Sequence, residues 1–182
     1  MKIAISGKSG CGNSTVSRRV AERLGYRLVN YTFKDVAEER GVPFEEIRRR
    51  AESDPSIDRD LDRKQVEMAR AGDTVLASRL AIWKLEDADL KVYLDAPLPV
   101  RAARIRQRKR AHGHEPSDFE SVLLETRERD DRDHDRYLKL YGIDNDEFRF
   151  ADMVVDAGIL HFEEIADRIV LEANERMSST ST

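Results

Sequence analysis

The residues best suited to chemistry lie in one short stretch, residues 7–15, with the sequence Gly-Lys-Ser-Gly-Cys-Gly-Asn-Ser-Thr. This stretch contains the pattern Gly-x-x-x-x-Gly-x-Ser, in which glycines let the main chain approach an anion and backbone N–H groups surround a phosphate. An apolar run at residues 3–5 precedes it, and a segment with helical spacing of apolar residues follows it. The N-terminus of that helix would face the same anion. We therefore predict a phosphate-binding loop, whose alternative is a glycine-rich turn without a ligand.

Two residues of this loop invite specific expectations. The hydroxyl of Ser14 could ligate a magnesium ion, which prefers oxygen ligands. Cys11 is the single cysteine of the chain, so no internal disulfide can form, and we expect it to fill space rather than to do redox chemistry.

Arginines form the second chemically capable group. Five of them lie within residues 101–110 and four within residues 127–136. In the second set, Arg129, Arg132 and Arg136 are spaced i, i+3 and i+7 and so share one face of a helix, where they repel one another unless an anion lies among them. Guanidinium groups bind phosphate through a planar fork. Two such helices, joined by a loop at residues 111–116, indicate a lid over phosphates. The alternative is a solvated helix whose charges are paired, because aspartates are interleaved with these arginines.

The elements that must position these residues alternate along the chain. Apolar runs predict strands at residues 3–5, 26–30, 74–78, 90–94 and 153–155. Helical spacing predicts two helices that end at Gly25 and at Gly41, and further helices at residues 43–53, 55–71, 98–110 and 161–177. A long helix is predicted to begin at a capping box formed by Ser117 and Glu120 and to end at about residue 141. This alternation is typical of a parallel sheet covered on both faces, whose ligands lie beyond the carboxyl ends of the strands. We therefore expect the chemistry at residues 7–15, 31–35, 77–80 and 95–97, with Arg79 projecting into the ligand crevice unless it is an ordinary surface arginine.

Composition bounds the remaining possibilities. The 182 residues suit one domain, and the formal net charge of −4 with 37% charged residues does not point to nucleic acid. No stretch predicts a signal peptide or a membrane span, so we expect a cytoplasmic protein. His112 and His114 lie in the predicted loop without cysteine partners, and we interpret them as solvated rather than metal-bound. The Ser/Thr-rich residues 178–182 predict a disordered tail.

Beyond single motifs, the sequence resembles the nucleoside monophosphate kinases, most closely the short, archaeal-type cytidylate kinases. The resemblance covers about residues 1–172, and residues 129–136 are also similar to the lid helix of the longer bacterial cytidylate kinases. The stretches that carry it are the loop at 7–15 and residues 54–58, 61–65, 78–83, 88–97 and 136–144.

This resemblance implies a P-loop kinase fold of the α/β class. It implies a single domain over residues 1–177, with a five-stranded parallel core at 1–30, 72–104 and 137–177, a monophosphate-binding insert at 31–71 and a lid at 105–136. The implied activity is transfer of the γ-phosphoryl group of ATP to CMP or dCMP with Mg²⁺ as cofactor. The implied partners are these nucleotides, with no nucleic acid or membrane, and the family is usually monomeric.

The resemblance also implies roles for individual residues. Those expected to hold the ATP phosphates are Gly7, Lys8, Ser9, Gly10, Cys11, Gly12, Asn13, Ser14 and Thr15, with Ser14 at the magnesium ion. Those expected to contact the acceptor nucleotide are Arg79 at its phosphate, Arg129 and Asp133, with Asp62 and Gln65 lining the base pocket. Those expected near the phosphates during transfer are Arg104, Arg108, Arg132 and Arg136.

Two positions depart from the family pattern. Asn13 replaces the usual loop lysine, and Lys8 or a lid arginine could supply the missing charge. Ala77 stands where relatives usually carry an acidic residue that helps to hold magnesium through water, and Asp95 could partly replace it. These departures leave open a nucleotide-binding sensor without turnover, and a kinase for another small acceptor also remains possible on this fold. The sequence does not decide between cytosine and uracil in the acceptor.

Overall fold

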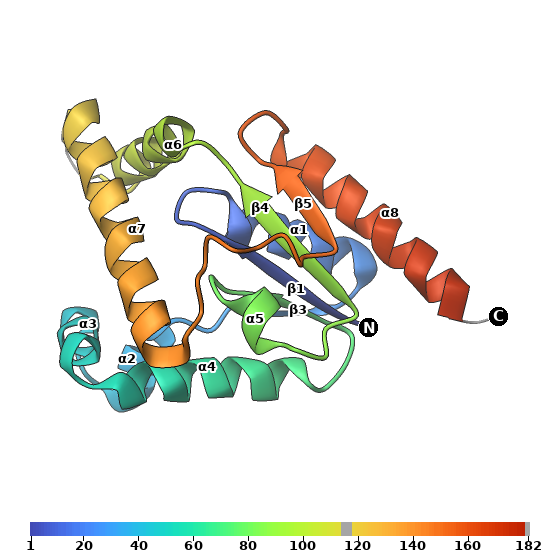
Figure 1. Cartoon of the computed structure of the whole chain (residues 1–182), viewed down its shortest axis with the longest axis horizontal. Helices are drawn as coiled ribbons and strands as arrows, with labels where there is room; N and C mark the ends of the chain where they lie inside the picture. Colours follow the sequence, from blue (N-terminus) through green and yellow to red (C-terminus); the bar gives the residue numbers. More distant parts are fainter. Residues whose placement is uncertain (114–117, 181–182) are drawn as a thin grey trace.

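The structure, a computed structural model, describes residues 1–113 and 118–180, and its centre is a parallel sheet (Figure 1). The sheet has five strands in the order β2-β3-β1-β4-β5, and every pairing is parallel, as predicted. The register pairs Ile5 with Ala77 and Gly7 with Leu94, so the carboxyl ends of the three central strands lie side by side. The strands are β1 (Lys2–Gly7), β2 (Arg27–Val29), β3 (Thr74–Ala77), β4 (Leu90–Asp95) and β5 (Met153–Asp156).

Helices cover both faces of this sheet. Helices α1 (Asn13–Leu24) and α8 (Phe162–Thr180) cover one face, whereas α4 (Pro55–Ala69) and α5 (Ala81–Lys84) cover the other (Figure 1). Successive side chains of β1 point to opposite faces of the sheet and so contribute to the hydrophobic core on each face. Ile3 and Ile5 pack with α1 and α8, while Ala4 packs with α5. The four-residue helix α5 was not predicted, since it is too short to show a helical period.

The segment between β2 and β3 folds into three helices, α2 (Phe33–Arg40), α3 (Phe44–Ser53) and α4. Thr32 and Asp35 form a capping box at the start of α2, and Gly41 ends it with a left-handed φ of 63°. Buried side chains such as Val36, Ile47 and Ile57 give these helices a hydrophobic cluster of their own. The insert therefore has packing that is separate from the two sheet cores.

Helices α6 (Leu98–Ala111) and α7 (Phe119–Tyr141) pack against each other (Figure 1). The predicted capping box at Ser117 was wrong in its position. The helix begins at Phe119, so Asp118 is the N-cap and its carboxylate accepts from the Ser121 N–H at 2.9 Å. Ser117 itself, like His114, lies outside the described residues.

The C-terminal helix is longer than predicted. Residues 178–180 continue α8 instead of forming a disordered tail, and positions 181 and 182 lie outside the described residues. The hydroxyls of Ser178 and Ser179 each donate to a backbone carbonyl four residues earlier at 2.9 Å, which gives these polar groups partners within the helix.

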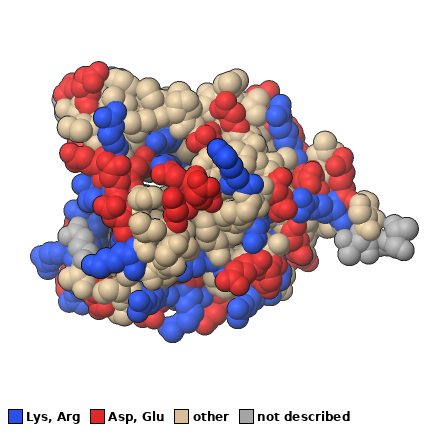
Figure 2. Space-filling model, viewed as in Figure 1, with Lys and Arg blue, Asp and Glu red and all other residues tan. Residues whose placement is uncertain are grey.

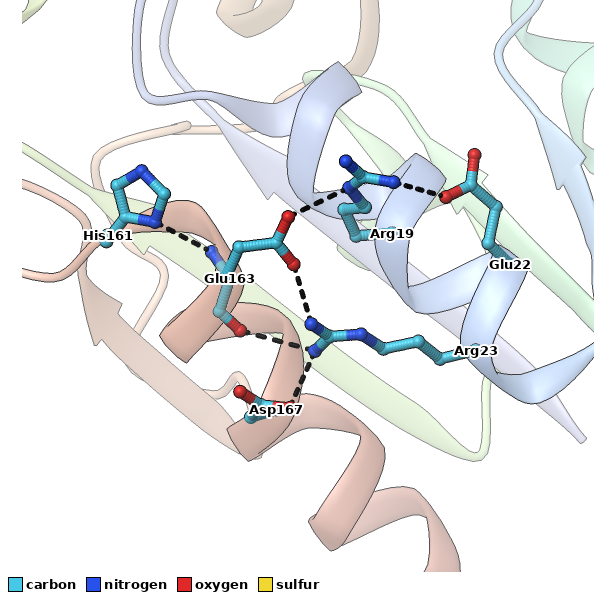
Figure 3. A network of polar contacts seen from close by, with 6 residues as sticks. All are labelled: Arg19, Glu22, Arg23, His161, Glu163 and Asp167. Atoms are coloured by element: carbon cyan, nitrogen blue, oxygen red, sulfur yellow. Dashed lines mark hydrogen bonds and ion pairs between the residues drawn. The ribbon is translucent and has the colours of Figure 1, made fainter.

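An ion-pair network fastens α8 to α1 (Figure 3). Arg23 contacts Glu163 at 2.6 Å and Asp167 at 2.7 Å, and Arg19 contacts Glu163 at 3.1 Å. Elsewhere basic and acidic side chains are interspersed over the face shown in Figure 2. None of the helices in the described part of the chain has the length and hydrophobicity needed to cross a membrane.

Candidate active site

The glycine loop between β1 and α1 has the conformation that its glycines require. Gly10 and Gly12 have φ of 90° and 94°, which side-chain-bearing residues rarely adopt. A Cβ at Gly10 would lie 2.8 Å from the Arg101 carbonyl oxygen, and one at Gly7 would lie 2.7 Å from the Leu94 carbonyl oxygen. A Cβ at Gly12 would meet nothing within 4 Å. The loop is thus pressed against β4 and α6 on one side and open beside Gly12, where an anion can approach the backbone.

Asn13, at the position of the usual loop lysine, serves a structural role in this geometry. Its side-chain N–H donates to the Ser78 carbonyl oxygen at 3.2 Å, and its oxygen accepts from the Ser17 hydroxyl at 3.2 Å. The first bond ties the start of α1 to the carboxyl end of β3, and the second holds the Asn13 side chain within α1. Positive charge at the loop must therefore come from another residue.

Lys8 is the nearest source of that charge within the loop. It forms an ion pair with Asp146, in the segment between α7 and β5. His134 Nδ1 lies 3.0 Å from the Asn145 oxygen and 3.6 Å from Asp144, so α7 holds the same segment. The ligand atoms of His134, Asp144 and Asp146 could converge on a metal, but Lys8 already balances the Asp146 charge.

Cys11 is part of the hydrophobic core and is 2% exposed. Burial raises the pKa of its thiol to about 11, with the nearby Arg101 charge lowering it and Asp95 raising it. The thiol therefore stays protonated at neutral pH, which supports a packing role.

Arg101 links the loop to the lid helices. It is 5% exposed, and its Nε and Nη1 donate to the carbonyl oxygens of Ala96 at 3.0 Å and Ser9 at 3.1 Å. Its Nη2 lies 2.7 Å from the Asp130 carboxylate on α7. Sequence reasoning counted Arg101 among the arginines of its helix but gave it no role and missed Asp130. The signal that could have separated Arg101 from the others is its neighbour Ala102, since the two share the buried side of α6.

A chain of alternating charges runs from the sheet to the insert. Arg79, directly after β3, is ion-paired with Asp133 on α7. Asp133 also contacts Arg136 at 3.1 Å, and Arg136 Nε lies 3.7 Å from the Asp58 carboxylate on α4. Three elements that are distant in sequence thus meet through four side chains, of which Asp58 was not predicted as a site residue.

Three arginines gather beside this chain of charges. The pKa of Arg129 is lowered to about 10, first by burial and then by the positive charges of Arg79 and Arg108. Arg129 is exposed at the surface of α7, so solvent moderates the effect of burial, and the repulsion of the other two guanidinium groups is the remaining cause. Arg129 stays protonated at neutral pH, so the cluster is a site of positive potential that favours an anion.

Four other predicted site residues differ in their exposure and partners. The Arg132 side chain is 70% exposed, with Glu128 at 3.7 Å, and Arg104 is half-buried on α6. Gln65 is buried and donates to the Tyr31 carbonyl oxygen at 2.6 Å. Asp62 lines a separate surface groove, and burial raises the pKa of its carboxyl group.

A small cavity of about 10 Å³ lies where these elements meet. It is below the roughly 300–1,000 Å³ usual for ligand pockets. Because Arg79 is ion-paired with Asp133 and Lys8 with Asp146, a larger anionic ligand must displace these carboxylates to enter. The lining residues are Gly7, Lys8, Ser9, Arg79, Tyr93, Asp130, Asp133 and Asn145.

Oxygen donors suited to Mg²⁺ are present at the same edge of the sheet. The Ser14 side chain is exposed at the start of α1, and Asp95 is exposed at the carboxyl end of β4, beside the loop. Ala77 is 4% exposed and offers no donor from β3. A serine hydroxyl and a carboxylate, completed by water and phosphate oxygens, form a donor set that magnesium accepts.

The sheet, the glycine loop, the helical insert and the arginine-bearing helices together define a P-loop kinase fold. Solved structures agree: shikimate kinase from Acinetobacter baumannii, in complex with shikimate, is similar with a TM-score of 0.60, at 17% identity over 95% of this chain and 92% of that one. Deoxyadenosine kinase from M. mycoides, with bound dATP, is similar with a TM-score of 0.54, at 18% identity over 96% of this chain and 100% of that one.

Sequence comparison then specifies the family. The chain belongs to the cytidylate kinase-like family, whose model matches residues 2–159. It is 43% identical over 180 residues to cytidylate kinase 2 of Borreliella afzelii, covering 97% of this chain and 98% of that one. It is 38% identical over 156 residues to the cytidylate kinase of Pyrococcus horikoshii, covering 85% and 78%. The resemblance to archaeal-type cytidylate kinases is thereby confirmed.

Proposed function

We propose that this protein transfers the γ-phosphoryl group of ATP to CMP or dCMP, giving the nucleoside diphosphate and ADP. One structural observation carries the proposal: Arg79 lines a cavity with Gly7, Lys8 and Ser9 of the glycine loop at the carboxyl edge of a parallel sheet, and the charges of Arg79 and Arg108 both lower the pKa of Arg129. Relatives named cytidylate kinase match the chain over most of its length, and their name supports a cytidine nucleotide as the acceptor. We further propose that the protein acts as a monomer in the cytoplasm.

In this reaction an oxygen of the acceptor phosphate attacks the γ-phosphorus of ATP, and ADP leaves with the electrons of the broken bond. Phosphoryl transfer of this kind depends on alignment and charge neutralisation more than on covalent help. The backbone N–H groups of residues 7–15 hold the ATP phosphates, and Asn13 fixes the start of α1 against β3. Arg79 and Arg129 hold the acceptor phosphate, while Arg104, Arg108, Arg132 and Arg136 surround the transferring group.

Mg²⁺ neutralises charge on the ATP phosphates when it is bound, and Ser14 and Asp95 are the residues that would hold it. Lys8 adds positive charge to the loop once phosphates replace Asp146 as its partner. Asp133, released from Arg79, becomes free to contact the acceptor nucleotide. Closing α6 and α7 over the phosphates excludes water, which would otherwise accept the phosphoryl group.

A coupled assay of ADP release tests the proposal. Purified protein with Mg²⁺ and ATP is offered CMP, dCMP, UMP, AMP or GMP, and a reaction without acceptor measures hydrolysis of ATP. We expect release with CMP and dCMP well above that background. No release with any acceptor, together with calorimetric binding of ATP or CMP, would replace the kinase by a nucleotide-binding sensor.

A pair of variants ties the activity to the site. Arg79→Ala should lower kcat/KM for CMP by about 100-fold, because it removes charge-assisted hydrogen bonds to a phosphate. Arg48→Ala is the matched control, since Arg48 is exposed on α3 and contacts Glu45 on the same helix. Equal activities in the two variants would place the acceptor phosphate elsewhere.

A further inference from the structure

A second cavity, larger than the first, lies beside α4. It is a surface groove of about 380 Å³, within the roughly 300–1,000 Å³ usual for ligand pockets. It is bordered by α4, by the last residue of α5 and by the last residue of α7, and it shares no lining residue with the active-site cavity. The chain therefore has a cavity of ligand size apart from the glycine loop and Arg79. The lining residues are Arg59, Asp62, Arg63, Val66, Glu67, Arg70, Lys84 and Tyr141.

Positive charge is in excess around this groove. Four of its lining side chains are cationic and two are anionic, although the formal net charge of the chain is −4. Arg59, Arg70 and Lys84 form no ion pair with another described side chain. Burial lowers the pKa of Lys84, and the charge of Arg59 lowers it further while Asp62 raises it. An anion bound between these cations would relieve their repulsion.

An aromatic side chain and a buried hydroxyl add contacts of a second kind. The Lys84 ammonium lies 3.0 Å from the centroid of the Tyr141 ring, and Val66 contributes apolar surface to the groove. The Tyr141 hydroxyl oxygen is buried and has no hydrogen-bond partner in the described part of the chain, although burial and then the Asp62 carboxylate raise the pKa of this hydroxyl. A buried polar group without a partner is unfavourable unless a ligand or water completes it.

The length of the groove and its two kinds of contact select the ligand. Arg59 and Arg70 are separated along α4 by about 16 Å, at roughly 1.5 Å per residue, so the groove is longer than a single phosphate group. Guanidinium and ammonium groups bind phosphates, whereas a heterocyclic base stacks on guanidinium planes. A nucleotide offers both a chain of phosphates and a base within such a length.

We propose that the groove is a second nucleotide-binding site, which takes a nucleoside triphosphate apart from the catalytic site. Its phosphates lie at Arg59, Lys84 and the hydroxyl of Tyr141, which donates the hydrogen bond that it otherwise lacks. Its base lies toward Val66 and Arg70, where an apolar side chain and a guanidinium plane can pack against it.

Calorimetric titration with CTP in the presence of EDTA counts bound nucleotides without turnover, because phosphoryl transfer needs the metal. Arg59→Gln combined with Arg70→Gln removes two charges of the groove, and neither arginine holds an ion pair whose loss would affect folding. Arg48→Gln combined with Arg49→Gln is the matched control, since both residues are exposed on α3. We expect the groove variant to bind one CTP per chain fewer than wild type and the control to bind as many as wild type. Equal binding by all three proteins would overturn the proposal.

A second titration separates a nucleotide site from a site for any polyanion. Inorganic tripolyphosphate is titrated into the same proteins, and the binding that the groove variant loses should be at least tenfold weaker for tripolyphosphate than for CTP. Equal affinities would mean that the base contributes nothing and would overturn the assignment to a nucleotide. Lys84→Gln should weaken the same CTP binding, so the test stays decisive if the double variant does not fold.

Kinetics distinguish the groove from the acceptor site. The groove variant should keep kcat/KM for CMP within about twofold of wild type, because distant sites contribute independently. A loss of about tenfold or more would make the groove part of the acceptor site and would overturn the proposal. A wild-type protein that phosphorylates no nucleotide would overturn the proposed function and leave this inference to the CTP titration, which needs no turnover.

Discussion

Replacing Arg101 by alanine should lower the free energy of unfolding by about 3–5 kcal/mol, because it removes one partner of a buried ion pair. Arg101 is 5% exposed and Asp130 is 9% exposed, so the variant would leave the Asp130 carboxylate buried without its cation. It would also free the carbonyl oxygens of Ser9 and Ala96, which now accept at 3.1 Å and 3.0 Å. At about 2–4 °C per kcal/mol for a chain of this length, Tm should fall by roughly 6–20 °C.

Urea unfolding followed by far-ultraviolet circular dichroism measures this loss, with an unchanged slope m as the check that unfolding stays two-state. Arg110→Ala is the matched control, since Arg110 is exposed near the end of α6, and it should stay within about 0.5 kcal/mol of wild type. The double variant Arg101→Met with Asp130→Leu should recover most of the stability, because apolar residues replace both charges. It should not recover ATP affinity, because the Ser9 carbonyl stays unheld.

Two results would refute the reasoning. The first is an Arg101→Ala protein within 1 kcal/mol of wild type, which would mean that water reaches the Asp130 carboxylate in the folded protein. The second is a double variant no more stable than Arg101→Ala, which would mean that packing around the Arg101 side chain, and not its charge, supplies the stability.

Three further predictions address other parts of the molecule. Gly10→Ala should have a lower Tm than Gly12→Ala. Both positions have a positive φ that costs alanine about 1–2 kcal/mol, but only the Cβ at Gly10 would also meet a carbonyl oxygen, at 2.8 Å. Equal Tm values would contradict this. Burial raises the pKa of Asp58 above its unfolded value, so its ionised form disfavours the folded state at neutral pH and the penalty vanishes once the carboxylate is protonated in both states. Ligand-free Asp58→Asn should therefore melt above wild type at pH 7, with the difference fading as pH falls toward about 4, and the opposite order at pH 7 would show that the neighbouring guanidinium outweighs burial. Arg23→Ala should lower the unfolding free energy by about 1 kcal/mol in dilute buffer and by less in about 1 M NaCl, since its partners are surface carboxylates; a loss that salt does not change would argue for packing instead.

Local sequence signals predicted the sheet and the loop because each is encoded by neighbouring residues. Apolar runs bounded by turns placed all five strands, and the glycine spacing placed the loop at residues 7–15. Arg79 was predicted to reach the ligand crevice because it follows a strand directly, and the structure brings it beside Gly7 and Lys8.

The carboxylates of the site were predictable only in part, because an ion pair depends on which elements meet in space. Asp133 was expected at the acceptor nucleotide, but Asp130 was considered only as a charge-balancing residue of a solvated helix. Asp58 and Asp146 lie about 80 residues or more from Arg136 and Lys8, and no periodicity along the chain reports on such pairs. Sequence analysis offered two interpretations of α7, a phosphate-binding lid and a solvated helix with paired charges. The structure supports both, since Asp130 and Asp133 face the site whereas Arg132 is solvated and lies 3.7 Å from Glu128.

The ion pairs of Arg79 with Asp133 and of Lys8 with Asp146 affect which anions the ligand-free protein binds. A carboxylate fixed on the same chain competes at a high effective concentration, so a small free anion such as sulfate or inorganic phosphate must displace it with a few contacts of its own. A nucleotide can replace both of these intramolecular partners at once, Asp146 at Lys8 and Asp133 at Arg79. In the ligand-free site, Lys8 and Arg79 are therefore already ion-paired with aspartates of the same chain. A ligand binds more readily the more of these ion pairs it can replace with contacts of its own.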